Sequence, residues 1–559
     1  MEKNCKVLLL GDQTVGPLRQ RLEKRFEERY KGYGLSVLAN TSENRLIADV
    51  LESLDELVHN GPNALVLGVG VGDLLAGTAA QDFEDSLFSL CSRLQEANIR
   101  TILVSLFPLA GHKSHVKAYN AAIKRASTKF GYRLANVYAY WRHDLGKNHD
   151  VDASSLGDRE YEVILRAVAP VLEHTQMLVL WQFNGRYANC NYSCPYCYVA
   201  TSVNKGMHFN YDLEKWEQAF AKHFENQHTI FYFSYGEPMT ASRFYDVIEM
   251  VGRHPNWEAK ITSNVSVRLD KLLNSRVAKE GRLHINTSFH PTQVDIDTFI
   301  KKCDQIRECG IEPSIVYVMY PDQIDDLDEK YMPKFREKNY RVHIRAFRGL
   351  YGGRKYPGAY TQDQWNKTAK YMDEGNLKYQ LCEVNGLGRL SMLGVSHILV
   401  DNEGDIEMCD SYVGDRRYGN LFDDQLQLDL EPKPFPGLVP LAAVDDIADY
   451  VEVDYTDLTG NNVNSYITQG HVTFNEDGSI NYPYEFVDFN DKKVRTELTH
   501  VPAPFTSSWK FWLNPRWFCY HFVYSYIIKK YGKYVFAWVR GKIRLLKQGK
   551  LKKENFWHG

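Results

Sequence analysis

Residues 190–197 read C-N-Y-S-C-P-Y-C and come shortly after the apolar run L-V-L-W at 178–181. Cys190, Cys194 and Cys197 fall in this one short stretch, while the other cysteines of the chain are scattered. An apolar run of this kind is typical of a buried strand, so the cysteines are expected in the loop that follows it. Three soft sulfur ligands so close together predict a metal centre.

Two kinds of centre fit three thiolates. A structural zinc site uses four ligands, and no Cys or His follows Cys197 before His208. A [4Fe–4S] cube held by three cysteines instead keeps one iron open to a substrate or a cofactor. The sequence therefore favours an iron–sulfur cluster, with zinc as the alternative.

The composition is that of a globular protein with several domains: 559 residues, 44% hydrophobic and 25% charged. A net charge of -3 argues against a general attraction to nucleic acid. The scattered cysteines do not form a disulfide framework and fit a reducing compartment. The N-terminus has no signal-peptide pattern, and no apolar run is long enough to span a membrane, so we expect a cytoplasmic protein.

Short apolar runs alternate with longer amphipathic runs in two successive series, which predicts an α/β fold with parallel sheets. The first series, over 1–175, contains five expected strands, the last of them at 133–137, and predicts a flavodoxin-like domain. The second predicts a (βα)6 partial TIM barrel, with strands expected at 177–183, 229–234, 258–263, 283–289, 312–319 and 341–347. The helices expected between these strands include 267–280 and 325–338. The cysteine loop follows the first barrel strand, at the strand ends where barrel sites form.

The C-x3-C-x2-C spacing, with Tyr196 before the last cysteine, resembles the signature of the radical S-adenosylmethionine (radical SAM) enzymes. The stretch Y-G-E-P at 235–238 resembles the family's G-G-E-P motif, with Tyr in place of the first glycine. Asn264 closes the third expected strand, where many relatives have T-N-G, and Ser288 closes the fourth, where they often have S-L-D. The resemblance covers about residues 177–350.

This resemblance implies that Cys190, Cys194 and Cys197 hold three irons of a [4Fe–4S] cluster, while S-adenosylmethionine binds the fourth. Reductive cleavage of that cofactor would give a 5′-deoxyadenosyl radical, which abstracts hydrogen from the substrate. The backbone of 235–238 would meet the amino group of the cofactor. The resemblance implies these cofactor-binding residues: Tyr196, Gly236, Glu237, Pro238, Asn264 and Ser288.

Some of these polar residues have an ordinary structural explanation as well. Asn264, Ser288 and His290 could equally form hydrogen bonds at strand ends. Arg345 and Arg348, in H-I-R-A-F-R-G, would bind a carboxylate or a phosphate, or else form surface ion pairs.

The stretch at 391–409, S-M-L-G-V-S-H-I-L-V-D-N-E-G-D-I-E-M-C, resembles the opening hairpin of the SPASM/twitch extension in many radical SAM enzymes. Ser391 stands where the first cluster ligand belongs, and the later cysteine group is missing. We therefore expect a degenerate cap without a second cluster. Cys382 or Cys409 could donate a hydrogen atom to a substrate radical, although two inert buried thiols are the simpler interpretation.

The N-terminal series resembles the SGNH hydrolases, a lipase- and esterase-like family. The blocks L-L-G-D-Q-T, L-V-L-G-V-G-V-G-D-L-L and D-A-S-S-L-G-D-R-E-Y carry the resemblance. Gln13 replaces the nucleophilic serine, Gly72 the oxyanion asparagine and Ser155 the histidine base, so acyl transfer has no mechanism here. We expect a catalytically dead domain that keeps a carbohydrate or acyl-group cleft or serves in docking.

Residues 505–559 contain twelve Lys or Arg but a single acidic residue, Glu554, interspersed with Trp, Tyr and Phe. This pattern is typical of a helix in an anionic membrane interface. Packing against the barrel explains it equally well, and nucleic-acid binding less so.

The sequence thus predicts five parts: an SGNH-like domain over 1–175, the barrel over 176–350, a degenerate cap over 351–430, an irregular β extension over 431–504 and the basic tail over 505–559. The predicted function is hydrogen abstraction from a sugar or lipid-linked glycan, served by an electron donor such as a flavodoxin or ferredoxin. A peptide-modifying enzyme and a metal-stabilised scaffold protein are the alternatives. Peripheral contact with the inner face of a membrane would follow from the tail.

Overall fold

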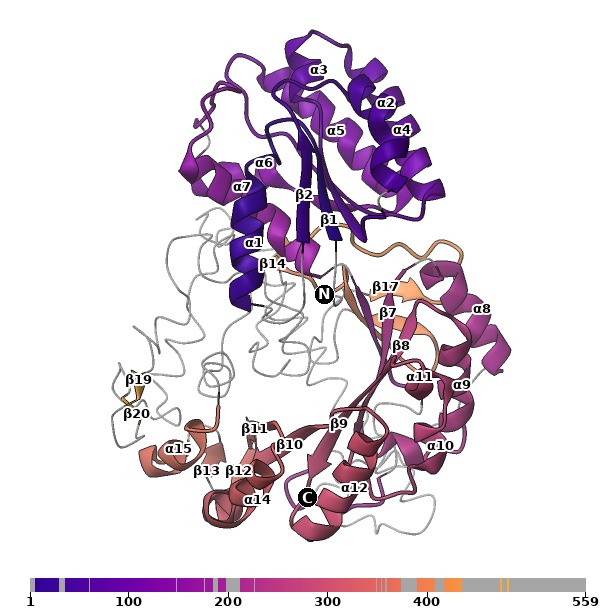
Figure 1. Ribbon diagram of the computed structural model, residues 1–559, viewed down its shortest axis with the longest axis vertical. Coiled ribbons are helices and arrows are strands. Elements are labelled where there is room, and N and C mark those ends of the chain that lie inside the picture. Colours follow the sequence, from indigo (N-terminus) through magenta and orange to yellow (C-terminus); the bar gives the residue numbers. More distant parts are fainter. Residues whose placement is uncertain are drawn as a thin grey trace, which may run out of the picture.

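The computed structural model describes two α/β halves joined by a later segment of the chain (Figure 1). It describes residues 6–29, 36–59, 61–146, 148–174, 176–183, 190–197, 212–225, 227–347, 349–352, 354–356, 359–372, 390–407, 417–434, 473–474 and 480–481. Most of 431–504 and all of 505–559 lie outside the described residues, as do Arg348, Cys382 and Cys409.

The N-terminal half is a five-stranded parallel sheet in the order β2-β1-β3-β4-β5, with helices on both faces. This is the doubly wound order of flavodoxin-like folds, as the alternating pattern predicts. The strands are β1 (Lys6–Gly11), β2 (Ser36–Thr41), β3 (Ala64–Gly68), β4 (Arg100–Val104) and β5 (Arg133–Ala135). The helices are α1 (Leu18–Arg29), α2 (Ile47–His59), α3 (Val71–Leu75), α4 (Ala80–Glu96), α5 (Lys113–Phe130), α6 (Val137–Asp144) and α7 (Asp158–Glu173).

The second half is built on six parallel strands that follow the chain in order, β6 to β11. They are β6 (Met177–Trp181), β7 (Thr229–Phe233), β8 (Trp257–Ser263), β9 (Leu283–Phe289), β10 (Ser314–Met319) and β11 (Val342–Ala346). The helical segments between them are α8 (Leu213–Phe224), η2 (Pro238–Thr240), α9 (Phe244–Arg253), α10 (Asp270–Leu273), α11 (Arg276–Lys279), α12 (Ile296–Glu308), η3 (Pro321–Gln323), α13 (Ile324–Asp326), η4 (Leu327–Tyr331) and α14 (Met332–Glu337). This is the predicted (βα)6 partial barrel.

The burial pattern along the strands shows which face of the barrel sheet packs against the helices. In β8 and β9 every second residue is buried, and these residues join a large core cluster with the helices. The alternate residues point to the opposite face, since successive side chains of a strand point to opposite faces. That opposite face, called here the inner face, is where a barrel encloses its site.

The hairpin predicted near 397–408 exists, but it extends the barrel sheet. β15 (His397–Val400) pairs in parallel with β6, and β16 (Asp405–Glu407) and β17 (Arg417–Asn420) follow antiparallel, which gives a sheet of nine strands. The turn between β15 and β16 contains Gly404 at a φ of 86°, a conformation that glycine adopts without strain. Asp401 Oδ1 accepts from the N–H groups of Glu403 and Asp405 and closes this turn.

The flanks of this hairpin belong to the other half of the molecule. Met392 and Val395 are buried in the core of the N-terminal half, and the N–H of Leu134 donates to the carbonyl of Leu430 at 2.8 Å. The segment 390–434 therefore ties the two halves together. Short elements complete the described chain: β12 (Gly349–Tyr351), β13 (Arg354–Tyr356), α15 (Gln362–Ala369), β14 (Leu390–Ser391), β18 (Lys433–Pro434), β19 (Thr473–Phe474) and β20 (Ile480–Asn481).

Three expected elements differ in detail. The strand expected at 133–137 ends at Ala135, because the Asn136 side chain accepts from the N–H of Ala139 and caps α6. The helix expected at 267–280 is split into α10 and α11, since Ser275 caps the second of them. The helix expected at 325–338 contains a π segment, η4, just before Pro333, whose ring nitrogen has no hydrogen to donate.

Truncation of Met392 tests the shared core. Because this side chain is fully buried in the N-terminal core, Met392→Ala should lower the free energy of unfolding by about 2–5 kcal/mol, as other buried Met truncations do. Urea unfolding followed by circular dichroism measures this change. Leu75→Ala, at a leucine that is 43% exposed, is the control and should change stability by less than about 0.5 kcal/mol. Equal effects of the two substitutions would contradict the shared core.

Candidate functional site

The cysteine loop lies at the carboxyl end of β6 and contacts the loops that follow β8 and β9. The Asn191 side chain donates to Ser266 Oγ at 2.8 Å and accepts from Asn264 Nδ2 at 3.1 Å. The N–H of Ser193 donates to Gln293 Oε1 at 3.1 Å, and the Tyr196 hydroxyl lies 2.9 Å from His290 Nδ1. Two predicted site residues, Asn264 and His290, are thus brought to the cysteine loop, where His290 meets Tyr196.

The three thiols share a partly buried environment. Cys194 is buried, and Cys190 and Cys197 are half-buried. Burial, strengthened by the charges of the other two cysteines, raises the pKa of Cys194 to about 12, and burial also raises the pKa of Cys190. Cys190 Sγ accepts hydrogen bonds from the Tyr192 N–H at 3.4 Å and from Asn264 Nδ2 at 3.7 Å. Thiols arranged in this way repel one another as thiolates unless a cation holds them.

The described part of the chain contains no group of three His, Cys, Asp or Glu side chains arranged around a single metal ion. A [4Fe–4S] cluster does not require three ligands around a single ion, because each thiolate binds a different iron.

Glu237 joins the ends of β7 and β8. Its carboxylate is only 1% exposed and accepts from the Ser263 hydroxyl at 2.9 and 3.0 Å, from the Asn264 N–H at 2.6 Å and from the Met239 N–H at 3.2 Å. Burial raises the pKa of Glu237 to about 7, although these hydrogen bonds act in the opposite direction. The Glu237 side chain is therefore fully engaged in holding two loops in place. Only the backbone of its own turn remains available to bind a ligand.

Backbone conformations of positive φ gather at the same strand ends. Tyr235 has a φ of 73°, Gly236 of 61° and Val265 of 49°. A tyrosine and a β-branched valine in this region cost free energy, and such residues concentrate at functional sites. Tyr235 stands where the family motif has glycine, so the sequence departs from the motif at a position that still adopts the glycine conformation.

Comparison with known families shows which class of domain contains the cysteine loop. The sequence model of the radical SAM superfamily matches residues 186–332, which include the cysteine loop, Glu237 and Asn264. Residues 186–332 are a radical SAM domain. The chain is accordingly an enzyme of the radical SAM class, and the family implies a [4Fe–4S] cluster and S-adenosylmethionine as cofactors.

Solved structures also resemble parts of the chain. They include anSMEcpe with bound AdoMet (17% identity, 45% of this chain, 79% of that chain, TM-score 0.35). They also include the α/β hydrolase LAE5 from the metagenome of Lake Arreo, Spain (13% identity, 30% of this chain, 94% of that chain, TM-score 0.27). The acetylxylan esterase Axe2 from Geobacillus stearothermophilus matches similarly (13% identity, 30% and 93%, TM-score 0.27). No curated protein gives a significant match.

The inner face of the radical SAM domain changes from apolar to polar across the sheet. Over β6, β7 and β15 it carries a small apolar cluster of Leu178, Leu180, Ile230, Tyr232 and Leu399. Over β8, β9 and β11, alternation places polar side chains on this face: Lys260, Thr262, Asn286, Ser288, His343 and Arg345. Sequence reasoning anticipated Ser288 and Arg345 but missed the other four, although the strict alternation in β8 and β9 marks them.

Contacts on this face link neighbouring strands. The Tyr232 hydroxyl lies 2.8 Å from Thr262 Oγ1, which also accepts from Asn286 Nδ2 at 3.4 Å. Lys260 Nζ lies 5.1 Å from the centre of the Tyr232 ring. The polar side of the inner face is therefore an ordered lining of hydroxyl, amide and ammonium groups.

In the N-terminal half, other groups occupy the two positions at which the hydrolases have their nucleophile and their oxyanion residue. Gln13 and Asn44 exchange hydrogen bonds, at 3.2 Å between side chains and 2.9 Å from the Asn44 N–H. A Cβ at Gly72 would collide with the backbone oxygens of Asn44 and Arg45, so the oxyanion asparagine of the hydrolases has no room there. The segment around Asn44 thus leaves no room for an asparagine at position 72 and binds Gln13, which stands in the place of the nucleophile.

The surviving acids of the outline have structural partners. Asp12 accepts from the N–H groups of Thr14 and Val71, at 2.9 and 3.0 Å, and burial raises its pKa to about 6. Asp73 accepts from the N–H of Ile47 at 3.1 Å. Ser155, in the place of the base, is exposed and donates to the carbonyl of Asp152.

The helices of the described residues include none that is long and apolar enough to cross a membrane.

Replacement of Glu237 by glutamine tests the buried carboxylate. Its pKa of about 7 in the folded protein lies above the value of about 4.3 in the unfolded chain. The folded state therefore binds the proton more tightly, and the contribution of this group to stability falls as the pH rises from about 4 to about 7. Glu237→Gln should remove that slope, which amounts to up to about 3 kcal/mol between the two pH values.

Urea unfolding at pH 5 and pH 8, on the wild type and the variant, measures the slope. Glu249→Gln, at an exposed position of α9, is the matched control and should keep it. An unchanged slope in Glu237→Gln would show that Glu237 is already ionised in the folded protein at pH 5.

Proposed function

We propose that Cys190, Cys194 and Cys197 hold the [4Fe–4S] cluster of this enzyme and that it abstracts hydrogen from a sugar or a lipid-linked glycan. The observation that supports the cluster assignment is the contact of the three-cysteine loop, through Cys190, with Asn264, whose backbone N–H is held by Glu237 at the same end of the barrel. The donor set fits the group: three sulfur ligands in one loop, with N–H donors on one of them.

When bound, the cluster and S-adenosylmethionine supply a 5′-deoxyadenosyl radical for hydrogen abstraction. The protein has to hold the cofactor, orient the substrate and exclude water. Glu237 fixes the backbone of 235–238, whose carbonyl groups are the proposed partners of the cofactor's amino group. Asn264, held by Asn191 and Ser266, donates toward Cys190 Sγ. Tyr196, Gly236, Pro238 and Ser288 are the remaining proposed cofactor-binding residues.

The inner face supports the proposed substrate class. Hydroxyl and amide groups of Thr262, Asn286 and Ser288 suit a substrate rich in hydroxyl groups, and Lys260 and Arg345 suit a carboxylate or phosphate on it. The hydrolase-like N-terminal half and the basic aromatic tail favour an envelope glycan precursor carried on a lipid. Modification of a peptide is the second candidate, since the β15–β16 hairpin resembles the one found in peptide-modifying relatives.

The partners follow from the proposed reaction. A one-electron donor such as a flavodoxin or ferredoxin would reduce the cluster. Residues 505–559 would bring the enzyme to an anionic membrane surface where a lipid-linked substrate resides. In a purely structural role the same cysteines would stabilise a scaffold protein, and cofactor cleavage distinguishes the two.

Cys194→Ala tests the cluster ligands. After anaerobic reconstitution, the wild type should hold about four irons per chain and convert S-adenosylmethionine to 5′-deoxyadenosine on reduction. Cys194→Ala should lose the conversion, because two thiolates cannot hold the cube in place. Chromatography of 5′-deoxyadenosine and iron analysis are the measurements.

Cys309→Ala removes an exposed thiol of the same domain and is the matched control, which should retain both iron and activity. Bound zinc without cofactor cleavage in the wild type would reject the cluster and favour the scaffold interpretation. About eight irons per chain would contradict the single-cluster assignment.

Deuterium transfer tests the substrate class. With a lipid-linked sugar that carries deuterium on its ring carbons as substrate in ordinary water, we expect deuterium in 5′-deoxyadenosine, and a faster release of 5′-deoxyadenosine than without substrate. A set of short peptides is the control. Stimulation by the peptides but not by the sugars would replace the glycan proposal with the peptide one, while leaving the cluster assignment intact.

A further inference from the structure

A cavity of about 320 Å³ lies between the two halves of the molecule, on the side away from the radical SAM site. Its N-terminal wall consists of residues at the amino ends of β4 and β5, among them Arg100 and Arg133. Its other wall is the end of α8 and the turn before β7, from Ala221 to Gln227. Barrel chemistry belongs to the carboxyl ends of the strands, so this cavity, at the opposite end, is separate from it. Its size falls at the small end of the range for small-molecule sites.

The guanidinium of Arg133 is the feature that needs explanation. Arg133 is only 8% exposed and lines the cavity. Its Nη1 donates to the carbonyl of His174, but its Nη2 has no hydrogen-bond partner among the described residues. Burial, with the like charge of Arg100 as a second cause, lowers the pKa of Arg133 to about 9, which still leaves it cationic at neutral pH. A buried charge without a counter-ion is costly, so a ligand that supplies one would be favoured.

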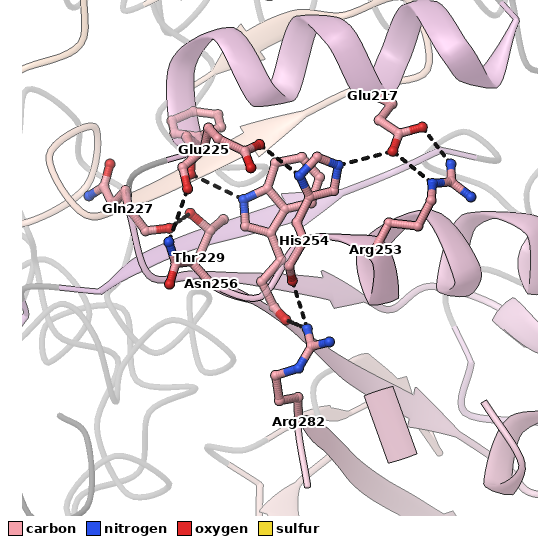
Figure 2. Close-up of polar contacts among 10 residues, drawn as sticks. Glu217, Glu225, Gln227, Thr229, Arg253, His254, Asn256 and Arg282 are labelled. Carbon is pink, nitrogen blue, oxygen red and sulfur yellow. Dashed lines mark hydrogen bonds and ion pairs between the residues drawn. The ribbon is translucent and has the colours of Figure 1, made fainter. Parts of the chain in front are cut away.

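The cavity contains little negative charge of its own. Glu225 is the one carboxylate among the described lining residues, and its Oε2 lies 2.7 Å from His254 Nδ1. Figure 2 shows His254 held between Glu225 and Glu217, with Arg253 on the far side of Glu217. The Glu225 charge is therefore engaged on the barrel side. Lys222 forms an ion pair with Asp424, which is not part of the lining, so the positive charge of the lining rests on Arg133, with Arg100 beside it.

The same network makes the barrel wall of the cavity rigid. The Asn256 side chain donates to the carbonyl of Glu225 at 3.2 Å (Figure 2). The Trp257 indole donates to the carbonyl of Phe224 at 3.1 Å. The His254 ring stacks on Trp257, with 3.7 Å between the ring centres. The carbonyls of Phe224 and Glu225 at the end of α8 thus already accept hydrogen bonds from within the barrel.

His223 adds an acceptor to these cations. Burial lowers the pKa of His223, which favours the neutral ring, and the ring also bonds to the backbone of Leu421. Its Nε2 is buried and has no hydrogen-bond partner among the described residues. A neutral ring that donates through Nδ1 presents Nε2 as an acceptor, which suits a hydroxyl group of a ligand.

We propose that this cavity binds a small phosphate monoester that carries hydroxyl groups, with Arg133 and Arg100 on the phosphate and His223 Nε2 on a hydroxyl. Arginine suits this role because its planar fork binds phosphate oxygens in pairs. The site joins the two halves, so an occupant contacts both the N-terminal sheet and the barrel.

Ribose 5-phosphate, inorganic phosphate and ribose, each titrated into the full-length protein by calorimetry, are the probes. Ribose 5-phosphate should bind most tightly, inorganic phosphate more weakly, and ribose not at all. Arg100→Gln should weaken both phosphate ligands at least about tenfold, since it removes a charge from the site. Arg133→Gln should do the same, although it also removes the bond to His174 and therefore requires a check of folding.

His223→Phe should weaken ribose 5-phosphate while leaving inorganic phosphate unchanged. Lys113→Gln is the matched charge control, because Lys113 begins α5 and lies roughly 25 Å along the helix from the cavity. Absence of ribose 5-phosphate binding at millimolar concentration, or equal affinity in Arg100→Gln and Lys113→Gln, would overturn the proposal. Calorimetry needs no radical chemistry, so failure here leaves the proposed function untouched.

Discussion

The buried carboxylate of Glu237 is the constraint on which the geometry of the site depends. It accepts hydrogen bonds from both the loop after β7 and the loop after β8, and the second loop in turn reaches Cys190 through Asn264. One side chain therefore fixes the 235–238 turn and the end of β8 together. The cysteine loop is held to them through Asn264 and also through its own contacts to Ser266, His290 and Gln293. The positive φ angles of Tyr235, Gly236 and Val265 persist because these bonds hold the backbone on both sides.

The sequence predicts the regular parts of this structure well. Short apolar or alternating runs mark the six barrel strands and the five strands of the first sheet. They do so because helices cover a parallel sheet, and side chains that face those helices must be apolar. What the sequence does not reveal is pairing between distant segments. The residues H-I-L-V at 397–400 do not by themselves show that this strand pairs with β6. That pairing depends on the free edge of β6, which is distant in the sequence.

Within the candidate site, motif spacing singles out the cysteine loop, Tyr196, Glu237 and Asn264 as candidates, but the burial of Glu237 could not be derived from that spacing. A glutamate in a turn is usually solvated, and only its neighbours in space, Ser263 and the N–H groups of Asn264 and Met239, show that it is buried. Gly72 in the N-terminal half is a second case in which the sequence does not reveal the surroundings of a residue. The replacement of asparagine by Gly72 looks like a simple loss in the sequence, but in the structure the backbone at Asn44 and Arg45 occupies the vacated space.

The placement of Met392 and Val395 in the N-terminal core has a consequence for biosynthesis. During translation the first sheet emerges long before these two side chains, and the stretch from Met177 to Met392, which includes the entire barrel, must be made before its core can be completed. Domains ordinarily fold one after another as they leave the ribosome, N-terminal first. Here the nascent first half has to persist with an unfilled apolar surface until the end of the barrel arrives, which makes it a natural client for chaperones that shield such surfaces.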